Sequence, residues 1–456
     1  MNIVILAAGK GSRMKSSLTK VLHQIGGKPM ITHVVETAAS LRPKKILVVV
    51  SENRKEIENE LKNLNINFQI KFVDQKPTLG TGHAVMMASP LLDETCNTLI
   101  LFGDVPLISP GSLKKLCKES NQPFLRVLTA IVENPSGYGR IIRDGNEKLI
   151  KKCIEEKDAN KTERNTKEIN TGIMYVSTKN LIDWVDKIDN KNEQHEYYLP
   201  QIISHANNEN ISVFPVLTTD VNEILGVNSS LQKSNVERIF QKKYAKEFCE
   251  KGLEISDINR FDVRGNLSFG KGVKIDIGCL FIGEVSIGNE VIIEPYCVIK
   301  NTSIGNHTIV KAFTHIENSV VGSNSIIGPY ARLRANTEIE NNCKIGNFVE
   351  TKNIELGANS KANHLSYLGD AQIGKNVNIG AGTITCNYDG NKKHKTTIED
   401  DSFIGSNSEL IAPVTIKKGA TVGAGTTLCE DVPEKSLSTS RAKQVNIIGW
   451  KKSNKS

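Results

Sequence analysis

The sequence predicts two parts of different architecture: an α/β half with a mostly parallel sheet, then a solenoid of short β-strands. In the first half, short apolar runs alternate with stretches of helical pattern. In the second half, an aliphatic residue returns at every sixth position. A chain of 456 residues also exceeds what one hydrophobic core usually serves, which favours more than one domain.

The apolar runs of the first half are residues 3–6, 46–50 and 99–102, and each leads into Gly, Ser or Asp. This alternation is typical of a parallel sheet with helices on both faces. Ligands of such sheets bind beyond the carboxyl ends of the strands. We therefore expect the chemistry of this half in the loops after Leu6 and Phe102.

A helix is expected over residues 230–250, with Ser230 as its N-cap and Gly252 as its stop. Its apolar residues are expected on one side, and we interpret this helix as the link between the two halves. Those residues are Leu231, Val236, Ile239, Phe240 and Tyr244.

The six-residue repeat covers about residues 253–437. Neither a helix, with a period of 3.6, nor a strand, with a period of 2, produces it alone. A short strand with one inward aliphatic residue and a tight turn does, and three such hexads close one triangular coil. The repeated positions include Val321, Ile327, Leu333, Ile339, Ile345, Ile373, Ile379, Ile404, Leu410, Ile416, Val422 and Leu428.

The composition excludes several classes of protein. No apolar run approaches the ~20 residues that cross a bilayer, and no secretory leader is expected. Nine cysteines without metal-type clustering indicate reduced thiols and a cytoplasmic location. A net charge of +8 is mild, so anionic small molecules are favoured over nucleic acid as partners.

The loop after the first strand reads Leu6-Ala7-Ala8-Gly9-Lys10-Gly11-Ser12-Arg13-Met14. Small residues let backbone N–H groups approach a nucleotide, and Arg13 and Lys20 offer cations to phosphate oxygens. The loop is not a dinucleotide fingerprint, because Met14 stands where that motif has Gly, and it lacks the spacing of a Walker loop.

This loop resembles that of the sugar-phosphate nucleotidyltransferases, and the hexads resemble the left-handed β-helix of hexapeptide-repeat acyltransferases. Over nearly its full length the chain resembles the bacterial enzymes that combine N-acetylglucosamine-1-phosphate uridylyltransferase with glucosamine-1-phosphate N-acetyltransferase. The resemblance implies a Rossmann-like α/β nucleotidyltransferase domain with a mostly parallel sheet at residues 1–228. It further implies a linker helix at 229–252 and a left-handed parallel β-helix of hexapeptide repeats at 253–456. One departure is Thr19, where the family usually has Pro.

The resemblance implies a uridylyltransferase site that uses UTP and Mg²⁺, or Mn²⁺ in its place. Asp104 and Asn228 would hold the metal, Gln75, Gly80 and Thr81 would read the uracil, and Arg13 and Lys20 would neutralise phosphate charge. On spacing alone, Asp104 could instead cap a helix, and residues 75–84 could be a plain strand-to-helix loop. Glu155 is adjacent to Glu156, so a slip of one residue would exchange them. The expected contacts are Leu6, Ala7, Ala8, Gly9, Lys20, Gln75, Gly80, Thr81, Phe102, Gly103, Asp104, Gly139, Glu155, Asn170 and Asn228.

The hexads break at residues 363–370, and the resemblance implies that His364 is the base of an acetyl transfer. An imidazole, with a reference pKa of ~6.5, suits that task. Residues 387–395 form a basic insertion that can leave the coil. The expected sugar-phosphate contacts are Arg334, Lys352, Tyr367 and Asn378. The expected acetyl-CoA contacts are Ala381, Asn387, Tyr388, Ser406, Ala424 and Arg441. The resemblance also implies a homotrimer with small-molecule substrates.

Two other interpretations are open. The β-helix could serve only for oligomerisation or regulation, as in ADP-glucose-type pyrophosphorylases, but His364, Asn387 and Arg441 would then have no purpose. The chain could also be a non-enzymatic scaffold like certain translation-exchange subunits. The combination of Arg13, Lys20 and Asp104 argues against that.

Overall fold

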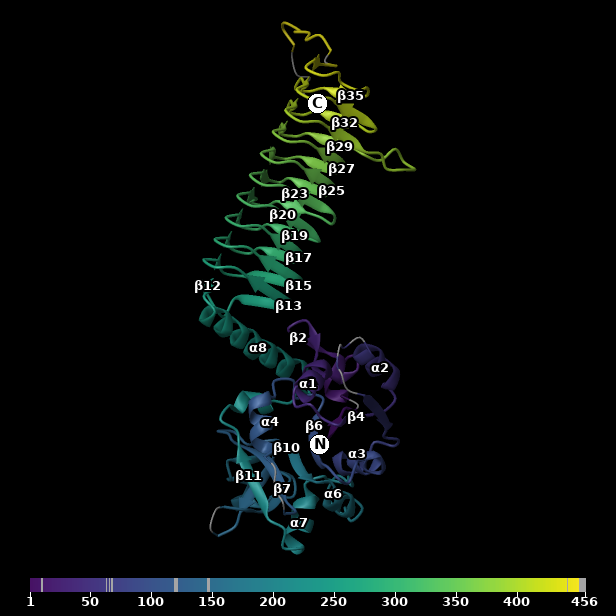
Figure 1. Cartoon of the computed structure of the whole chain (residues 1–456), viewed down its shortest axis with the longest axis vertical. Helices are drawn as coiled ribbons and strands as arrows, with labels where there is room; N and C mark the ends of the chain where they lie inside the picture. Colours follow the sequence, from purple (N-terminus) through teal and green to yellow (C-terminus); the bar gives the residue numbers. More distant parts are fainter. Residues whose placement is uncertain are drawn as a thin grey trace, which may run out of the picture. The chain divides into compact units, whose positions relative to one another are not determined.

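The computed structural model describes residues 1–9, 11–62, 64, 66, 69–118, 122–145, 148–440 and 442–450. The chain divides into two compact units, Met1–Phe240 and Gln241–Ser456 (Figure 1). None of the helices that the structure describes is both long and apolar enough to span a membrane.

The first unit is built on a nine-stranded mixed sheet whose main path runs β11-β7-β10-β6-β1-β4-β5. Strands β6, β1, β4 and β5 are parallel, whereas β10 is antiparallel to both of its neighbours. The expected mostly parallel core is confirmed. The strands of this sheet are β1 (Asn2–Leu6), β4 (Lys45–Val50), β5 (Ile70–Asp74), β6 (Asn97–Phe102), β7 (Leu125–Ile131), β8 (Gly139–Arg143), β9 (Ile150–Ile154), β10 (Glu168–Ser177) and β11 (Val213–Leu217).

Helices cover both faces of this sheet, as the alternating pattern predicts. Successive residues of a strand point to opposite faces, so Ile3 and Ile5 of β1 join one core while Val4 and Leu6 join the other. Helices α1 (Met30–Ala39), α2 (Arg54–Lys62) and α4 (Pro110–Leu116) supply the first core. Helices α3 (Thr81–Ala88), α6 (Thr178–Val185) and α7 (Gln201–Asn208) supply the second.

Shorter elements complete this unit. The hairpin strands β2 (Gln24–Ile25) and β3 (Lys28–Pro29) pair with each other. The remaining pieces are α5 (Lys161–Arg164) and the 3₁₀ turns η1 (Ser12–Met14), η2 (Lys20–Leu22), η3 (Ser89–Leu91) and η4 (Val221–Ile224).

Helix α8 spans Ser230–Glu250. Its first turn corrects one expectation: Ser229, not Ser230, is the cap, since its Oγ accepts from the N–H of Gln232 at 3.3 Å. Leu231 was expected on the packed side, yet it is 72% exposed. The reason is angular, because five residues of helix place it about 140° around the axis from the buried Val236. Gly252 ends the helix with φ +96, as expected.

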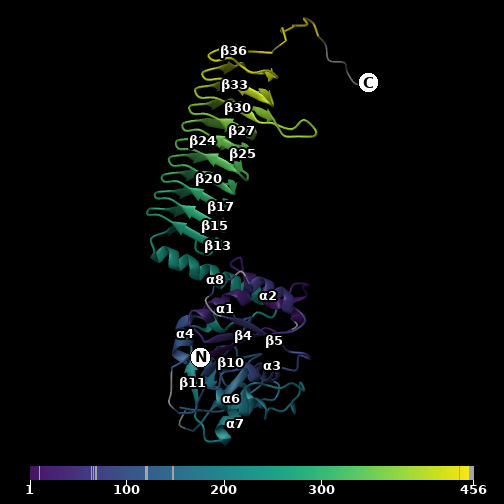
Figure 2. The same cartoon turned by 45° about the vertical axis from the view of Figure 1, so that its right-hand side comes forward.

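The second unit is a parallel β-helix of stacked coils (Figures 1 and 2). Aligned positions recur once in every coil: Ile327 pairs with Ile345, which pairs with Ala362, which pairs with Ile379. The interval from Ile327 to Ile345 equals three hexads, as the repeat predicts. Every aliphatic position of the predicted hexads is at most 6% exposed, so the predicted core is confirmed.

One side of the coil is an eleven-stranded parallel sheet. Its strands are β12 (Glu254–Ile255), β14 (Lys274–Ile275), β16 (Ile292–Ile293), β18 (Ile309–Val310), β21 (Ile326–Ile327), β24 (Lys344–Asn347), β26 (Lys361–His364), β28 (Asn378–Ile379), β31 (Phe403–Ile404), β34 (Thr421–Val422) and β36 (Leu437–Ser438).

The other two sides share a fourteen-stranded sheet, because long strands continue around a corner. Strand β17, for example, pairs with β19 over its first half and with β20 over its second. The strands are β13 (Phe261–Phe269), β15 (Cys279–Ile287), β17 (Val298–Ile304), β19 (His315–Glu317), β20 (Ser319–Val321), β22 (Arg332–Leu333), β23 (Thr337–Ile339), β25 (Glu350–Leu356), β27 (Tyr367–Ile373), β29 (Ile384–Cys386), β30 (Thr396–Ile398), β32 (Glu409–Ile411), β33 (Val414–Ile416) and β35 (Thr427–Leu428).

One corner of the coil carries a stack of exposed aromatic rings. Tyr296, Phe313, Tyr330 and Phe348 follow one another one coil apart, with ring centroids 5.0–5.4 Å apart. Each has a φ between +55 and +59, a backbone region that bulky residues seldom adopt. The stacked rings offset part of the cost of that turn, since aromatic pairs contribute about 0.5–1.5 kcal/mol beyond their buried area.

Replacing a fully buried hexad residue should destabilise the coil. Ile327→Ala removes side-chain atoms from a position with no exposed area and should lower the free energy of unfolding by about 2–5 kcal/mol. Val320→Ala, at a position 51% exposed, is the matched control and should change it by less than about 0.5 kcal/mol. Urea unfolding followed by far-UV circular dichroism measures both, and equal effects would contradict the assignment of the core.

Candidate functional site

A cavity of about 520 Å³ lies at the carboxyl ends of the parallel strands in the first unit. The loop after β1, the loop after β5 and the end of β6 all contribute to it, as the sheet topology predicts. Its lining residues are Leu6, Ala7, Ala8, Gly9, Lys20, Val21, Gln75, Thr78, Gly80, Thr81, Ala84, Phe102, Asp104 and Glu196.

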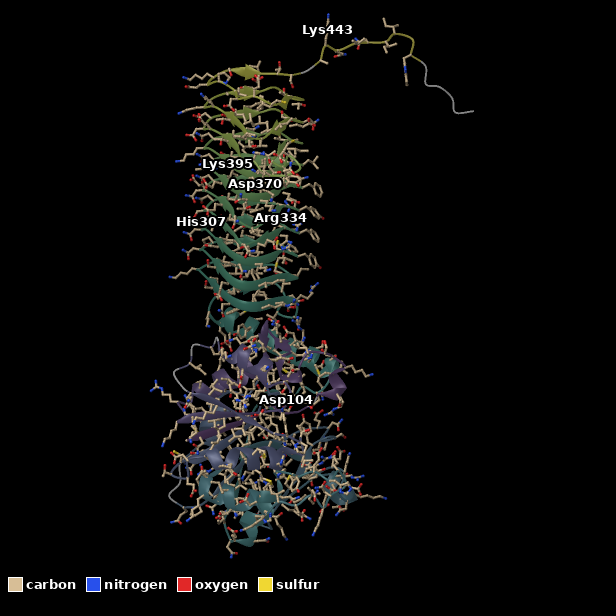
Figure 3. All side chains as sticks on the ribbon, turned by 90° about the vertical axis from the view of Figure 1, so that its right-hand side faces the viewer. Asp104, His307, Arg334, Asp370, Lys395 and Lys443 are labelled. Atoms are coloured by element: carbon tan, nitrogen blue, oxygen red, sulfur yellow. The ribbon has the colours of Figure 1, made fainter. Side chains whose placement is uncertain are left out.

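Lys20 and Asp104 line this cavity, and Lys20 contacts Asn228 as well (Figure 3 marks Asp104). The Lys20 ammonium donates to Asp104 Oδ2 at 2.5 Å and to Asn228 Oδ1 at 3.2 Å. The backbone brings the two oxygens together, because the N–H of Val227 donates to the carbonyl of Asp104 at 3.0 Å. Two side-chain oxygens therefore converge on one cationic atom. This is an arrangement that a divalent metal with few protein ligands can use.

The structure describes no group of three or more His, Cys, Asp or Glu side chains that could hold a metal. That finding is compatible with the Asp104–Asn228 pair, since one of its members is an amide and Mg²⁺ takes most of its ligands from water and phosphate. Asp104 does not cap a helix: α4 begins at Pro110, and its cap is Ser109.

The remaining cation expected in this loop, Arg13, lies apart from that meeting point. Arg13 is exposed in η1 and does not line the cavity.

The same loop contains Thr19, which stands where the family usually has Pro. Thr19 has φ −51, close to the value that Pro would impose, and its hydroxyl donates to Glu56 Oε2 at 2.6 Å. A hydrogen bond thus supports the geometry that Pro imposes by its ring.

The loop from Gln75 to Thr81 is held tightly beside the cavity. Gly80 has φ +106, and a Cβ there would stand 2.7 Å from the carbonyl oxygen of Tyr197. The backbone of Tyr197 also pairs with the loop, accepting from Gly82 N–H at 2.7 Å and donating to Leu79 at 2.8 Å. The Thr81 hydroxyl accepts from the N–H of Leu199 at 3.2 Å. The loop is consequently clamped by the chain at 197–199.

The expected sugar contacts form a second cluster. Gly139 pairs with Asn170 across β8 and β10, and a Cβ on Gly139 would lie 3.3 Å from Glu155 Oε1. Burial raises the pKa of Glu155 above its usual range. The neighbouring Glu156 instead binds Arg140 at 3.6 Å. Of the two candidates, Glu155 is the one beside Gly139, whereas Glu156 binds Arg140 and accepts from the N–H of Gly137. None of Gly139, Glu155 and Asn170 lines the 520 Å³ cavity itself.

The Phe102 ring lines the cavity and requires glycine opposite it. Gly172 has φ +80, and a Cβ there would lie 2.5 Å from the Phe102 ring. Gly103 is similarly crowded, since a Cβ would lie 2.9 Å from Ile31. The sequence alone does not single out Gly172. Glycine is required at this position because of the Phe102 ring, which is distant in the sequence.

In the second unit, the parallel register places His364 at the head of a column of small residues. Counting two residues on from each aligned aliphatic gives Asn347, His364, Ala381, Ser406 and Ala424 in successive coils. Backbone contacts continue the column: Ala381 accepts from Asn407 N–H at 2.7 Å, and Ser406 accepts from Gly425 N–H at 2.8 Å. The expected base and three expected acetyl-CoA contacts therefore share one edge of the coil.

The His364 side chain is exposed, and its Nδ1 lies 2.8 Å from Asn347 Oδ1. An amide oxygen can only accept, so Nδ1 carries the hydrogen, and in the neutral ring Nε2 then keeps its lone pair. Reasoning from the sequence misses Asn347. The signal that could have found it is its place one coil before His364, at the aligned position of the neighbouring strand.

Basic side chains gather beside this column. Lys393 of the insertion and then Arg334 lower the pKa of Lys352 through their positive charges. Arg334 also donates to Glu350 Oε1 at 2.8 Å. These three neighbouring cations outnumber the two carboxylates near them, Glu350 and Asp370, and favour an anionic ligand. Lys393 is an addition to the expected set.

The inserted residues do leave the coil. Ile379 and Ile404 are aligned in neighbouring coils although the chain between them is longer than three hexads, and Tyr388 bridges to Lys393 across the loop. Asn387 is nearly buried and donates to Asp370 Oδ2 at 2.5 Å, whereas Tyr388 is 62% exposed. Arg441 lies outside the described residues.

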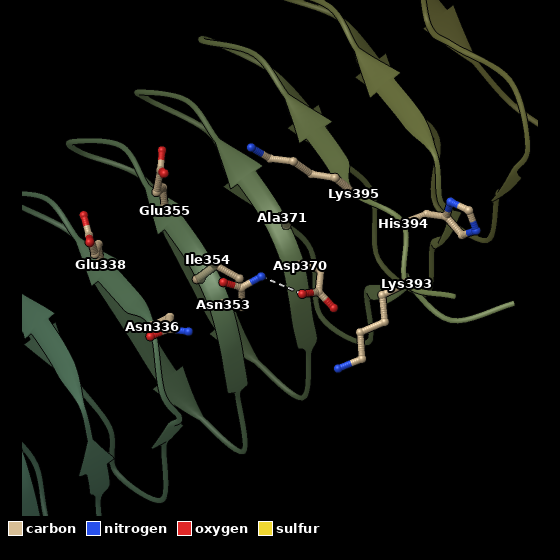
Figure 4. Close-up of a pocket in the computed structure, with 10 residues that line it drawn as sticks. All are labelled: Asn336, Glu338, Asn353, Ile354, Glu355, Asp370, Ala371, Lys393, His394 and Lys395. Atoms are coloured by element: carbon tan, nitrogen blue, oxygen red, sulfur yellow. Dashed lines mark hydrogen bonds between the residues drawn. The ribbon is translucent and has the colours of Figure 1, made fainter. Parts of the chain in front are cut away.

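A second cavity, of about 300 Å³, lies between this loop and the neighbouring coils. Lys393, His394 and Lys395 line it from the loop, and Asp370 and Asn353 line it from the coil, joined by a 2.6 Å hydrogen bond (Figure 4).

Tyr367 and Asn378 complete the expected sugar-phosphate set. Tyr367 pairs with Glu350 in the coil before it, and Asn378 pairs with Lys361. Tyr367 thus stands on the strand beside the basic residues, whereas Asn378 lies on the sheet that carries His364.

Comparison with known proteins agrees with both units. A MobA-like NTP transferase domain matches residues 3–149, a GMPPB C-terminal domain matches residues 263–339, and a hexapeptide repeat of succinyl-transferase matches residues 395–429. The Bifunctional protein GlmU of Herminiimonas arsenicoxydans is 46% identical over 452 residues, which is 99% of each chain. That of Cupriavidus pinatubonensis is 47% identical over 99% of this chain and 98% of its own.

This chain belongs to the bifunctional GlmU family. It is therefore an enzyme with two transferase activities, the first unit being the uridylyltransferase and the β-helix the acetyltransferase. The left-handed β-helix expected for GlmU agrees with the parallel coils. Neither a purely structural β-helix nor a non-enzymatic scaffold accounts for a match over the whole length.

The contact between Phe102 and Gly172 can be tested with a pair of glycine variants. Gly172→Ala places a methyl group against the ring, whereas Gly137→Ala has a similar positive φ but nothing within 4 Å of the added atom. We expect Gly172→Ala to lower uridylyl transfer at least tenfold and Gly137→Ala to lower it much less. Pyrophosphate release measures both, and equal losses would show that backbone strain, not the ring contact, matters.

Proposed function

We propose that the first unit transfers UMP from UTP to N-acetylglucosamine-1-phosphate, giving UDP-N-acetylglucosamine and pyrophosphate. The β-helix supplies that acceptor by acetylating glucosamine-1-phosphate with acetyl-CoA. The product feeds peptidoglycan and, where it is made, lipopolysaccharide. This proposal rests on the presence of two sites in one chain. The first unit has a cavity of about 520 Å³ at the carboxyl ends of its parallel strands, and the β-helix has the column of aligned residues that contains His364.

In the uridylyl site, the small residues Leu6, Ala7, Ala8 and Gly9 would let the backbone approach the nucleotide, while Gln75, Gly80 and Thr81 read its base. Asp104 and Asn228 would hold Mg²⁺. When bound, the metal supplies positive charge to the phosphates. Lys20 already stands at both of these oxygens, so it is positioned to neutralise the phosphate that arrives there.

The attacking atom in this reaction is an anionic phosphate oxygen, so the chain needs no general base. Its task is to position the two substrates in line and to neutralise charge. Arg13 remains a candidate for the outer phosphates. Since its side chain is exposed, it would have to turn inward when UTP binds. Gly139, Glu155 and Asn170 would bind the sugar.

In the acetyl site, His364 would remove a proton from the ammonium group of glucosamine-1-phosphate through Nε2. The nitrogen then attacks the thioester carbonyl, the C–S bond breaks, and coenzyme A leaves as the thiol with the proton that the new amide nitrogen loses. Arg334, Lys352, Tyr367 and Asn378 would hold the sugar phosphate, and Lys393 adds a further cation. The small side chains of Ala381, Ser406 and Ala424 would leave room for acetyl-CoA along the coil, and Asn387, Tyr388 and Arg441 would contact it.

We further propose a cytoplasmic homotrimer with domain boundaries at 1–228, 229–252 and 253–456. The nine cysteines are all free, which supports a reducing compartment. The trimer rests on the behaviour of the family.

Reciprocal variants test the assignment of the two sites. Asp104→Ala should abolish formation of UDP-N-acetylglucosamine because it removes the charged metal ligand, while acetyl transfer continues. His364→Ala should lower acetyl transfer by about 10²–10⁴-fold and leave uridylyl transfer unchanged. Thiol release and pyrophosphate release from the same preparations measure each half. Loss of both activities in either variant would contradict independent sites.

The role of Asn347 has its own test. Asn347→Ala removes the acceptor for His364 Nδ1 and should lower kcat of acetyl transfer about tenfold, the equivalent of one hydrogen bond. Asn347→Asp keeps an acceptor and adds a negative charge, which favours the protonated ring. The acid limb of its rate profile should then move to higher pH. A profile unchanged in Asn347→Asp would show that the two side chains are not coupled.

A further inference from the structure

The uracil contact of the proposed function depends on one amide, that of Gln75. This side chain lines the cavity and is only 4% exposed. Its Nε2 donates to the carbonyl of Gly80 at 2.9 Å and lies 3.2 Å from His83 Nδ1. None of the described residues donates a hydrogen bond to its Oε1.

The contacts of Nε2 fix which end of the amide faces which way. A carbonyl oxygen cannot pair with another carbonyl oxygen, so the NH₂ group must face Gly80. One of its hydrogens goes to that carbonyl, and the other points to His83 Nδ1. Nδ1 must then be the unprotonated nitrogen of the ring. Burial lowers the pKa of His83 below its ordinary value, in agreement with a neutral ring.

His83 itself is held in place by the fold. It stands in the first turn of α3, and its ring lies against that of Tyr197 with centroids 6.1 Å apart and planes tilted by 37°. The backbone of Tyr197 clamps the loop at Leu79 and Gly82 on either side of Gly80. The two acceptors of the amide, Gly80 and His83, are thus fixed together.

We propose that His83 is a specificity-determining positioning residue that locks the Gln75 amide so that only its oxygen is offered to the base. This inference rests on the proposed function. An acceptor at that position suits a pyrimidine whose N3 carries a hydrogen, as uracil does. Cytosine has a lone pair at N3, which the oxygen repels. The lock therefore selects UTP over CTP by excluding the flipped amide.

The matching experiment compares three variants with UTP and with CTP. His83→Ala removes the second of the two acceptors, so the Gly80 carbonyl alone holds the amide and its orientation is less strongly fixed. His83→Gln can restore an acceptor through its own side-chain oxygen. Met87→Ala, at a 38% exposed position in the same helix, is the control. KM and kcat are measured for each nucleotide with N-acetylglucosamine-1-phosphate, and acetyl transfer is followed in the same preparations.

We expect His83→Ala to reduce the UTP-over-CTP ratio of kcat/KM by about three- to tenfold, the worth of one hydrogen bond. The change should fall mainly on KM for UTP, and His83→Gln should recover most of the ratio. Equal losses for UTP and CTP, or no loss, would overturn the role of His83 alone. If the unaltered protein forms no product from UTP while acetylating normally, the proposed uridylyl function fails first, and the inference fails with it.

Discussion

The parallel register of the coils is the constraint on which the acetyl site depends. Because equivalent positions recur once in every coil, any side chain is stacked above its counterpart in the coil before. Asn347 falls beneath His364 for this reason, and Ala381, Ser406 and Ala424 follow above it. The repeat that builds the hydrophobic core also aligns the outward-facing chemistry.

In the first unit, the topology of the sheet brings the residues of the site together. The strands β1, β5 and β6 end at one edge, so three loops far apart in the sequence reach a single cavity. Glycines allow segments to pack closely at this edge. A Cβ on Gly80 would clash with Tyr197, and a Cβ on Gly172 would clash with Phe102. The two units thus place their side chains by unrelated means, which suits two independent reactions.

Much of this organisation could be predicted from the sequence. Periodicity gave the buried hexad positions, and apolar runs gave β1, β4 and β6 nearly to the residue. Family motifs gave Lys20, Asp104 and Asn228, and the structure brings the Lys20 ammonium within hydrogen-bonding distance of the other two side chains. These features are local in sequence or carried by a repeat, so a pattern can detect them.

The parts that escaped prediction depend on contacts between distant segments. Leu231 lies about 140° around α8 from Val236, and the packing of Phe240 against His33 makes the Val236 side the buried one. The sequence does not show that Lys393 lies near Lys352, because this depends on how the insertion at 387–395 folds back onto the coil. The role proposed for His83 follows only from the orientation of the Gln75 amide, which the sequence does not give. Which of Glu155 and Glu156 lies beside Gly139 depends on how β9 pairs with β8, and the sequence does not show this pairing.

The most direct measurement of the central claim supplies the protein with glucosamine-1-phosphate, acetyl-CoA, UTP and Mg²⁺, and omits each in turn. Two separate sites working in sequence predict thiol release without UTP, and pyrophosphate release only when acetyl-CoA and UTP are both present. Pyrophosphate released from glucosamine-1-phosphate without acetyl-CoA, or thiol release that requires UTP, would contradict the account.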